Sequence, residues 1–342
     1  MELIKKLKSL DIVYISEEMY NYNEYTNLGN STNEMELSNH NQVLDILNKY
    51  FNSVTYYSSP KLFAENINKH KNSIIFPNWF GRNFRNRKGY IPAICESSSI
   101  KYIGADAHTH IISSDKYVSK LYAKEYGINS SDCVLINYND NQSDYILEKI
   151  STLDLPIIVK PNFEGNSVGV DKHSVFYNYS KASEFILSLQ NDIKESIIVE
   201  EYMMGHEIKV FLFGNNSCFH IIDEQKLVIG NNDYFKTEVF GLEEKVDYSK
   251  HINVSSTFLD QNTKNKFKKI FNSFKKVEYL RIDGRYDNDE FKLIELTPDC
   301  CIEQDSGFGD LFRWRGYTYE DAILSLVLNS LFPEEYQMTN RL

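Results

Sequence analysis

Short apolar segments alternate with amphipathic segments along the first hundred residues. Asp11–Ser16 (DIVYIS) predicts a buried strand, and Asn41–Phe51 predicts a helix whose apolar residues recur every three or four positions. Further apolar runs predict strands at 54–57, 73–76 and 101–103. Strands that alternate with helices are typical of a mostly parallel sheet with helical crossovers. We therefore expect an N-terminal, Rossmann-like α/β lobe over residues 1–104.

The pattern changes after Gly104. A helix at 114–126, strands at 133–137, 155–160 and 197–201, and a helix at 182–190 predict a small α+β lobe over residues 105–202. Residues 203–342 predict a third lobe with strands at 207–213 and 218–223, a poorly patterned stretch at 230–256 and a helix at 262–274. Two last strands, 278–285 and 290–296, flank a turn at Asp287-Asn-Asp-Glu, and a helix at Tyr319–Leu331 closes the lobe.

Composition narrows the classes of partner. The formal charge of −11 argues against nucleic-acid binding, which needs an accumulated basic surface. No apolar run approaches the ~20 residues that span a bilayer, and the first residues lack a secretion signal, so we expect no membrane partner. The 5 cysteines form no CxxC pair and predict neither a disulfide framework nor a zinc site. A cytoplasmic location is the simple inference.

A first candidate for chemistry is a strand that ends in a lysine and leads into a glycine loop. The apolar strand 155–160 ends at Lys160, and Gly165 and Gly169 follow. An ammonium group and the N–H groups of a flexible loop can together cradle phosphates. The segment lacks the GxxxxGK[ST] pattern of the P-loop. An ordinary strand-to-loop connection remains the alternative.

A second candidate places carboxylates beside apolar side chains. The strand 197–201 ends in Glu200 and Glu201, and Met203 and Glu207 follow around a turn. Acceptors next to an apolar slot suit the amino group of adenine and the hydroxyls of ribose. A strand end with ordinary surface acids is the alternative.

A third candidate joins the last two strands. Arg281 and Asp283 lie two residues apart on one strand, so they share a face, and Glu295 lies near the end of the next strand. Two carboxylates that converge near an arginine form an oxygen-rich site for Mg²⁺ bound to nucleotide phosphates. A surface salt-bridge cluster is the alternative.

In their order along the chain, these three candidates resemble the ATP-grasp ligases, and specifically the D-alanine–D-alanine ligase branch. The segment Pro156–Val170 is similar to the branch's loop pattern VKPxxEGSSVG, and 102–105 with 113–120 looks like the entry into its ATP-binding lobe. Residues 84–96 and Glu295-Leu-Thr-Pro-Asp-Cys resemble a sub-branch of ligase-like proteins. The resemblance covers nearly the whole chain and implies an ATP-grasp fold, in which two lobes sandwich the nucleotide.

The resemblance also implies roles for individual residues. ATP contacts are implied for Lys116, Lys160, Glu164, Gly165, Asn166, Glu200, Glu201, Met203 and Glu207. Two Mg²⁺ ions, with Mn²⁺ as a substitute, would be held by Asp283 and Glu295 together with Thr297 or Asp299. Catalytic roles are implied for Arg281, Ser167 and Lys245, with Lys236 as the alternative to Lys245. Substrate contacts are implied for Glu34, Ser306 and Arg313.

The implied reaction joins a carboxylate to an amine. ATP and the carboxylate would give an acyl-phosphate, which the amine would convert into an amide. The chain departs from the family at Thr297, where the family has asparagine, and at Asn166, where it has serine. Because the departures fall mostly where substrates sit, we expect a ligase of a specialised biosynthetic pathway. The alternatives are a D-alanine–D-alanine ligase of cell-wall synthesis and a non-catalytic nucleotide-binding relative. Small-molecule substrates are the expected partners, and analogy with relatives gives a homodimer.

Overall fold

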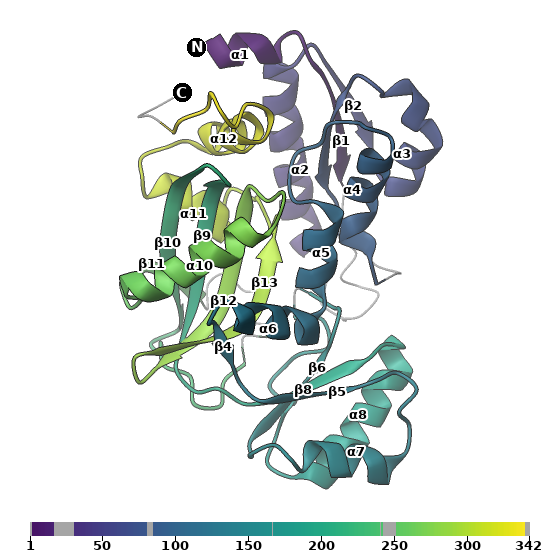
Figure 1. The fold of residues 1–342 in the computed structure, drawn as a ribbon, viewed down its shortest axis with the longest axis vertical. Helices are drawn as coiled ribbons and strands as arrows, with labels where there is room; N and C mark the ends of the chain where they lie inside the picture. The colour runs from purple at the N-terminus through teal and green to yellow at the C-terminus, as the bar shows by residue number, and fades with distance from the viewer. Residues whose placement is uncertain are drawn as a thin grey trace.

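The chain folds into three lobes, each built on its own sheet (Figure 1). The computed structural model describes residues 2–16, 31–80, 85–165, 167–239, 241 and 251–338, of which 31–39 and 251 are described in their backbone alone. Within these ranges no helix combines the length and the apolar character that a bilayer span requires. The cysteines at 95, 133, 218, 300 and 301 are all free thiols.

The first lobe has a parallel sheet of three strands. The strand order is β2 (Ser53–Tyr57), β1 (Asp11–Ser16), β3 (Ile74–Asn78). The surrounding helices are α1 (Glu2–Leu7), α2 (Ser31–Tyr50), α3 (Pro60–Asn66), a 3₁₀ turn (Ile67–Lys69) and α4 (Arg87–Ser97). The predicted parallel sheet is therefore confirmed. The strand expected at 101–103 is a single bridge between Ile75 and Tyr102, because the chain turns away at Gly104 (φ 96°).

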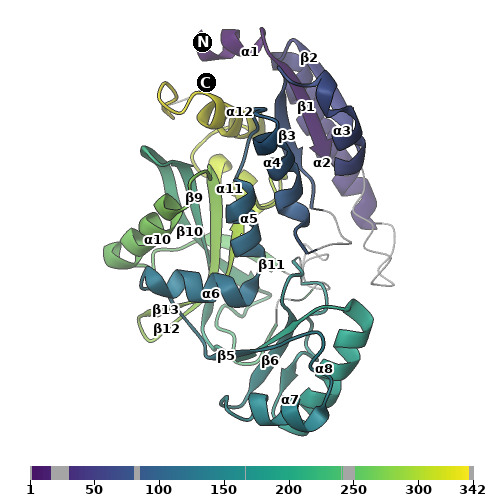
Figure 2. The same ribbon diagram turned by 45° about the vertical axis from the view of Figure 1, so that its right-hand side comes forward.

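The second lobe is a small antiparallel sheet with two helices on one face (Figure 2). Its strands follow the order β5 (Cys133–Ile136), β8 (Ile197–Glu201), β6 (Ile157–Pro161), β7 (Val175–Phe176). The helices α7 (Ser143–Ile150) and α8 (Tyr179–Ile193) bury an apolar cluster that includes Ile157, Val159 and Val199. Because side chains alternate along a strand, the polar residues Lys160 and Glu200 lie on the other face.

The third lobe holds the largest sheet. Its order is β11 (His251–Ser255), β10 (Cys218–Ile229), β9 (His206–Asn215), β12 (Tyr279–Asp287), β13 (Glu290–Pro298), β4 (Asn129–Ser130). One face packs on α5 (Ala107–Ser114), α6 (Lys116–Glu125) and α10 (Gln261–Ser273) through buried residues such as Ala105, Ala123 and Phe267. We predicted that residues 105–202 form one lobe, but α5, α6 and β4 pack with this third sheet, because the apolar face of α6 belongs to its core.

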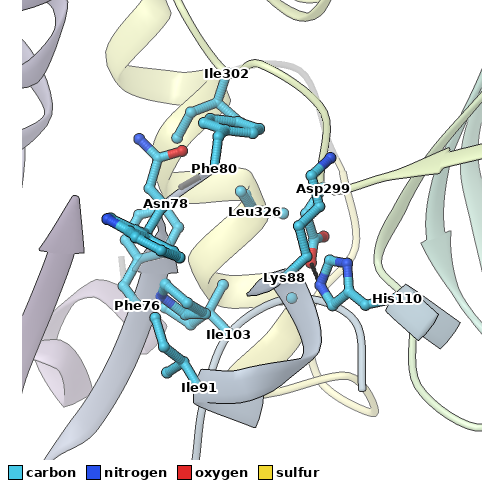
Figure 3. A pocket seen from close by; sticks show the side chains of 13 residues that line it. Phe76, Asn78, Phe80, Lys88, Ile91, Ile103, His110, Asp299, Ile302 and Leu326 are labelled. Carbon is cyan, nitrogen blue, oxygen red and sulfur yellow. Dashed lines mark hydrogen bonds and ion pairs between the residues drawn. The ribbon is translucent and has the colours of Figure 1, made fainter. Parts of the chain in front are cut away.

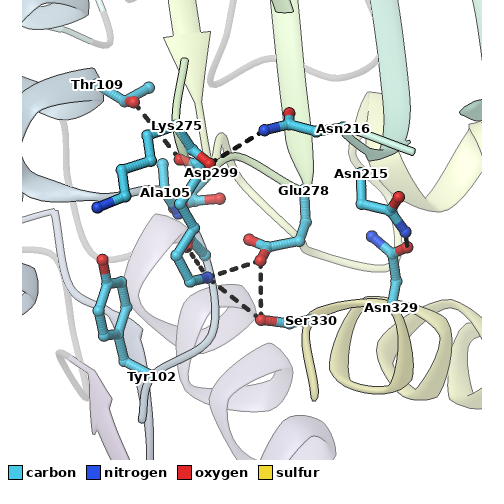
Figure 4. A network of polar contacts seen from close by, with 12 residues as sticks. Tyr102, Ala105, Thr109, Asn215, Asn216, Lys275, Glu278, Asp299, Asn329 and Ser330 are labelled. Carbon is cyan, nitrogen blue, oxygen red and sulfur yellow. Dashed lines mark hydrogen bonds and ion pairs between the residues drawn. The ribbon is translucent and has the colours of Figure 1, made fainter. Parts of the chain in front are cut away.

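Part of the opposite face of the large sheet is covered by α11 (Gly307–Arg313), α12 (Tyr319–Leu331) and α2 of the first lobe. Polar contacts fix the place where the chain crosses between these lobes (Figure 4). Lys276 Nζ donates to the Gly104 carbonyl at 2.5 Å and to Glu278 at 2.6 Å. Ser330 on α12 donates to the same Glu278 carboxylate at 2.9 Å. The first lobe is thereby tied to the large sheet beside the candidate site.

Candidate active site

Two lysines and one glutamate form a buried charge cluster between the small sheet and α6. Glu200 Oε2 lies 3.5 Å from Lys160 Nζ and 3.3 Å from Lys120 Nζ. Burial alone would raise the pKa of Glu200, but the two ammonium groups outweigh it and lower the pKa. The carboxylate that the family resemblance assigns to adenine thus neutralises the predicted phosphate lysine in this structure.

Lys120 connects this cluster to the strand that carries Glu295. Its Nζ donates to the carbonyls of Leu293 at 2.9 Å and Ile294 at 3.1 Å, both on β13. Lys160 is therefore linked through Glu200 and Lys120 to the strand that carries Glu295, at the junction of the small and large sheets.

The glycine loop is held at its beginning by residues from both neighbouring lobes. Lys116, at the start of α6, donates to the carbonyl of Glu164. Arg87 Nη2, at the start of α4, donates to the Phe163 carbonyl at 3.1 Å and to the Glu164 carboxylate at 3.0 Å. Burial lowers the pKa of Lys116, and Glu295 opposes the decrease. The start of α6, which contacts the glycine loop, and the acidic strand are thus within electrostatic reach of one another.

The acidic pair lies across two neighbouring strands. Asp283 of β12 is in register with Glu295 of β13, and Arg281 with Thr297. Register partners project from the same face of a sheet. Arg281 contacts Asp283 through Nε at 2.8 Å and Nη2 at 2.7 Å, and its Nη2 lies 3.7 Å from Glu295. The three side chains therefore share one face of the sheet and approach one another, as the spacing along the two strands predicted.

The residues fit a divalent cation held jointly with a nucleotide. In the part of the chain that the structure describes, no group of three or more His, Cys, Asp or Glu side chains could hold a metal alone. Two carboxylates that share a face of the sheet suit Mg²⁺, which prefers to complete its shell with phosphate oxygens and water. Burial raises the pKa of Asp283, and the nearby carboxylate of Glu295 adds to the increase against the effect of Arg281. A cation would relieve this repulsion.

Asp299 serves another part of the structure. Its Oδ2 accepts from the Ala105 N–H at 2.6 Å and lies 3.1 Å from His110 Nε2 (Figure 4 includes Ala105 and Asp299). The structure does not bring it to the acidic pair, whereas Thr297 shares their face. Of the two residues proposed to complete the metal site, Thr297 is therefore the better placed.

Two of the predicted substrate residues are engaged locally. The Ser306 hydroxyl caps α11 and donates to the Glu303 carbonyl at 2.7 Å. The Arg313 guanidinium contacts Asp305 at 3.2 Å and Asp310 at 3.1 Å at the surface. Nearby acids thus engage the Arg313 guanidinium in this structure.

The other predicted residues have simpler positions. Glu207 pairs with Arg285 at 3.1 Å, and Glu201 accepts from the Asp154 N–H at 2.9 Å. Met203 is partly buried and follows β8. In the glycine loop, the carbonyls of Gly165 and Ser167 each accept a hydrogen bond from a backbone N–H of the same loop. Lys236 is exposed, and its backbone N–H donates to the Glu238 carboxylate. Asn166, Lys245 and the side chain of Glu34 lie outside the described residues.

A cavity opens beside the acidic strand, between the first lobe and the large sheet. It holds about 520 Å³ of empty space, part of which is open to solvent. Figure 3 shows Phe76, Asn78 and Ile91 on one, mainly apolar, side of the cavity and Lys88, His110 and Asp299 on the other.

Several of these site residues were not assigned roles from the sequence. Lys88, Lys120 and Lys209 were missed because single lysines carry little local signal. Lys209 lies on β9, in register with Asp283 of β12, and burial lowers its pKa. The alternation of polar and apolar residues along 207–210 was the available clue.

Comparison with known proteins agrees with this geometry. Residues 122–328 match a family model described as the D-ala D-ala ligase C-terminus. A D-alanine–D-alanine ligase from a Nitratiruptor species is 27% identical over 74% of this chain and 73% of its own length. A D-alanine–D-alanine ligase from Helicobacter pylori is 30% identical over 61% of this chain, and this match spans 58% of the relative.

The fold has a solved counterpart. The crystal structure of a D-alanine–D-alanine ligase from Bacillus anthracis complexed with ATP has a TM-score of 0.67 and 16% identity, and covers 94% of this chain and 97% of that chain. The ATP-grasp fold expected from the sequence is thus confirmed. The chain belongs to the D-alanine–D-alanine ligase C-terminus family and is an ADP-forming carboxylate–amine ligase of the ATP-grasp class.

Proposed function

We propose that the chain is a D-alanine–D-alanine ligase, which joins two small amino acids at the expense of ATP. The observation that carries the proposal is the junction of the small and large sheets, where Lys160 of β6 is linked through Glu200 and Lys120 to β13, the strand that carries Glu295 beside Asp283. The comparisons support this substrate pair better than the specialised pathway that was our main expectation from the sequence.

In this proposal the protein contributes positioning and charge. Lys116 and Lys160 bind the phosphates of ATP, and Arg281 stabilises charge as the carboxylate attacks the γ-phosphoryl group. Asp283 and Glu295, with Thr297 beside them, would hold Mg²⁺, which supplies charge neutralisation at the phosphate oxygens when bound. The amine of the second substrate then displaces phosphate and forms the amide.

A different amino-acid pair is the second candidate. Thr297 is in register with Arg281, at the position where the resemblance expects asparagine, so the site departs from the family beside the reacting groups. A hydroxyl is a poorer Mg²⁺ ligand than an amide carbonyl, and the change alters the space that a substrate meets.

The test is incubation of the purified protein with ATP, Mg²⁺ and a panel of D- and L-amino acids. Phosphate release and product mass are measured together. Phosphate release with the D-alanyl-D-alanine mass supports the proposal. An amide from another pair supports the second candidate. ATP binding without release for any pair would instead indicate a non-catalytic relative.

A further inference from the structure

Lys88 projects from the first turn of α4 into the cavity of Figure 3. Its Nζ lies 5.2 Å from the centroid of the Phe80 ring, and within the described ranges it has no hydrogen bond or ion pair. No carboxylate of those ranges lies at ion-pair distance from it. Phe80 supplies only the weak attraction of an aromatic face for a cation. A partly buried ammonium group without an anion is costly, so an anionic ligand would stabilise it.

The surroundings of Lys88 point toward the reacting centre. Burial and the neighbouring Arg87 lower the pKa of Lys88 to about 8, while the carboxylate of Glu295 opposes the decrease and Arg281 adds to it. The side chain therefore remains mostly protonated at neutral pH. Glu295 and Arg281 therefore lie near enough to Lys88 to act on its charge, while its side chain lines the cavity.

The other charged groups near the cavity already have partners. Arg281 forms three hydrogen bonds to Asp283, and the Asp299 carboxylate is engaged by Ala105 and His110. Lys88 is thus the cation on the cavity wall that can accept a new anion. The apolar side of the cavity can receive the uncharged part of the same ligand.

We propose that Lys88 binds the reacting carboxylate of the first substrate and presents it to the phosphoryl site beside Glu295 and Arg281. This inference rests on the proposed function, because it assumes that a carboxylate substrate enters the cavity. An ammonium at this position offsets the repulsion between the carboxylate and the anionic γ-phosphate. Lys88 would then act on carboxylate affinity and not on nucleotide affinity.

The test uses Trp79, which lines the same cavity, as a fluorescent reporter. The chain has 2 tryptophans, so a Trp314→Phe background leaves Trp79 alone. Fluorescence is titrated with D-alanine, other amino acids and acetate in the presence of ADP and Mg²⁺. Lys88→Met removes the charge, Lys88→Arg keeps it, and Lys101→Met is the control because Lys101 is exposed in the same lobe.

We expect Lys88→Met to raise the Kd of the carboxylate ligand roughly tenfold to hundredfold, the range for a lost hydrogen bond to a charged group. Lys88→Arg should recover part of the affinity, and Lys101→Met should match the parent. D-alaninamide, which lacks the carboxylate, should not distinguish Lys88→Met from the parent. The ADP affinity should stay unchanged in all variants.

Three results would overturn the inference. The first is no saturable change in the parent with any carboxylate. The second is an equal carboxylate Kd in the parent and in Lys88→Met. The third is an equal loss of ADP and carboxylate affinity, which would make Lys88 a counter-ion of Glu295. Failure of the ligase proposal has a separate signature, since no amide would form even if carboxylate binding depended on Lys88.

Discussion

Substitution of Glu200 tests the buried charge cluster that supports the nucleotide site. Glu200→Gln keeps the size of the side chain and one acceptor oxygen but removes the negative charge. Lys120 and Lys160, which are both buried, would then face each other without the carboxylate that lies 3.3 Å and 3.5 Å from them.

The expected loss of unfolding free energy follows from the partners that remain. Removing one member of a buried ion pair costs ~3–5 kcal/mol. Lys120 retains two carbonyl acceptors on β13, so we expect a value near the lower end, ~3 kcal/mol. Because the folded pKa of Glu200 is lowered, its contribution is present above pH 4.5 and is lost as the pH falls through that lowered value.

The assay is urea unfolding followed by far-UV circular dichroism, at pH 7.5 and at decreasing pH below 4.5. Glu148→Gln is the matched control, because Glu148 is exposed in the same lobe. The difference between Glu200→Gln and the parent should narrow as the solution becomes acidic. A difference below ~1 kcal/mol at pH 7.5, comparable with a surface pair, would refute the reasoning.

Two further predictions concern the reacting centre and the glycine loop. Glu295→Gln should lower the rate of Mg²⁺-dependent phosphate release about 100-fold, since ~3 kcal/mol of charge stabilisation would be lost. A variant that keeps the full rate would show that Glu295 is not a metal ligand. Arg87→Met should weaken the anchor at Phe163 and Glu164 by ~1.5–3 kcal/mol and speed limited proteolysis within 163–170, whereas an unchanged cleavage rate would contradict that role.

Much of the fold could be predicted because the periodicity of its elements is strong. The helix Tyr319–Leu331 and the strand Ile197–Glu201 have the predicted bounds, since apolar residues mark each of their turns or alternate positions. Helix α2 begins at Ser31, whereas the sequence predicted a start at 41. Its first ten residues were missed because they are mainly polar and show little apolar periodicity. The assignment of α6 to the large sheet depends on long-range packing, which no local pattern records.

The candidate site was predictable where charged residues lie at fixed spacing. Arg281, Asp283 and Glu295 share a face because hairpin strands impose it. By contrast, Asp299 and Arg313 were assigned from neighbouring motifs, and local hydrogen bonds direct them elsewhere. Lys88 comes from a different lobe, and the packing of α4 against α5, which itself packs on β13, brings it within electrostatic reach of Glu295.

The transfer of oxygen from the acid substrate to phosphate tests the ligase mechanism most directly. D-alanine labelled with ¹⁸O in its carboxylate is incubated with the protein, ATP and Mg²⁺, and the released phosphate is analysed by mass spectrometry. An acyl-phosphate route requires one ¹⁸O atom in each phosphate that accompanies an amide bond. Amide formation with unlabelled phosphate, or release of AMP and pyrophosphate, would contradict the account.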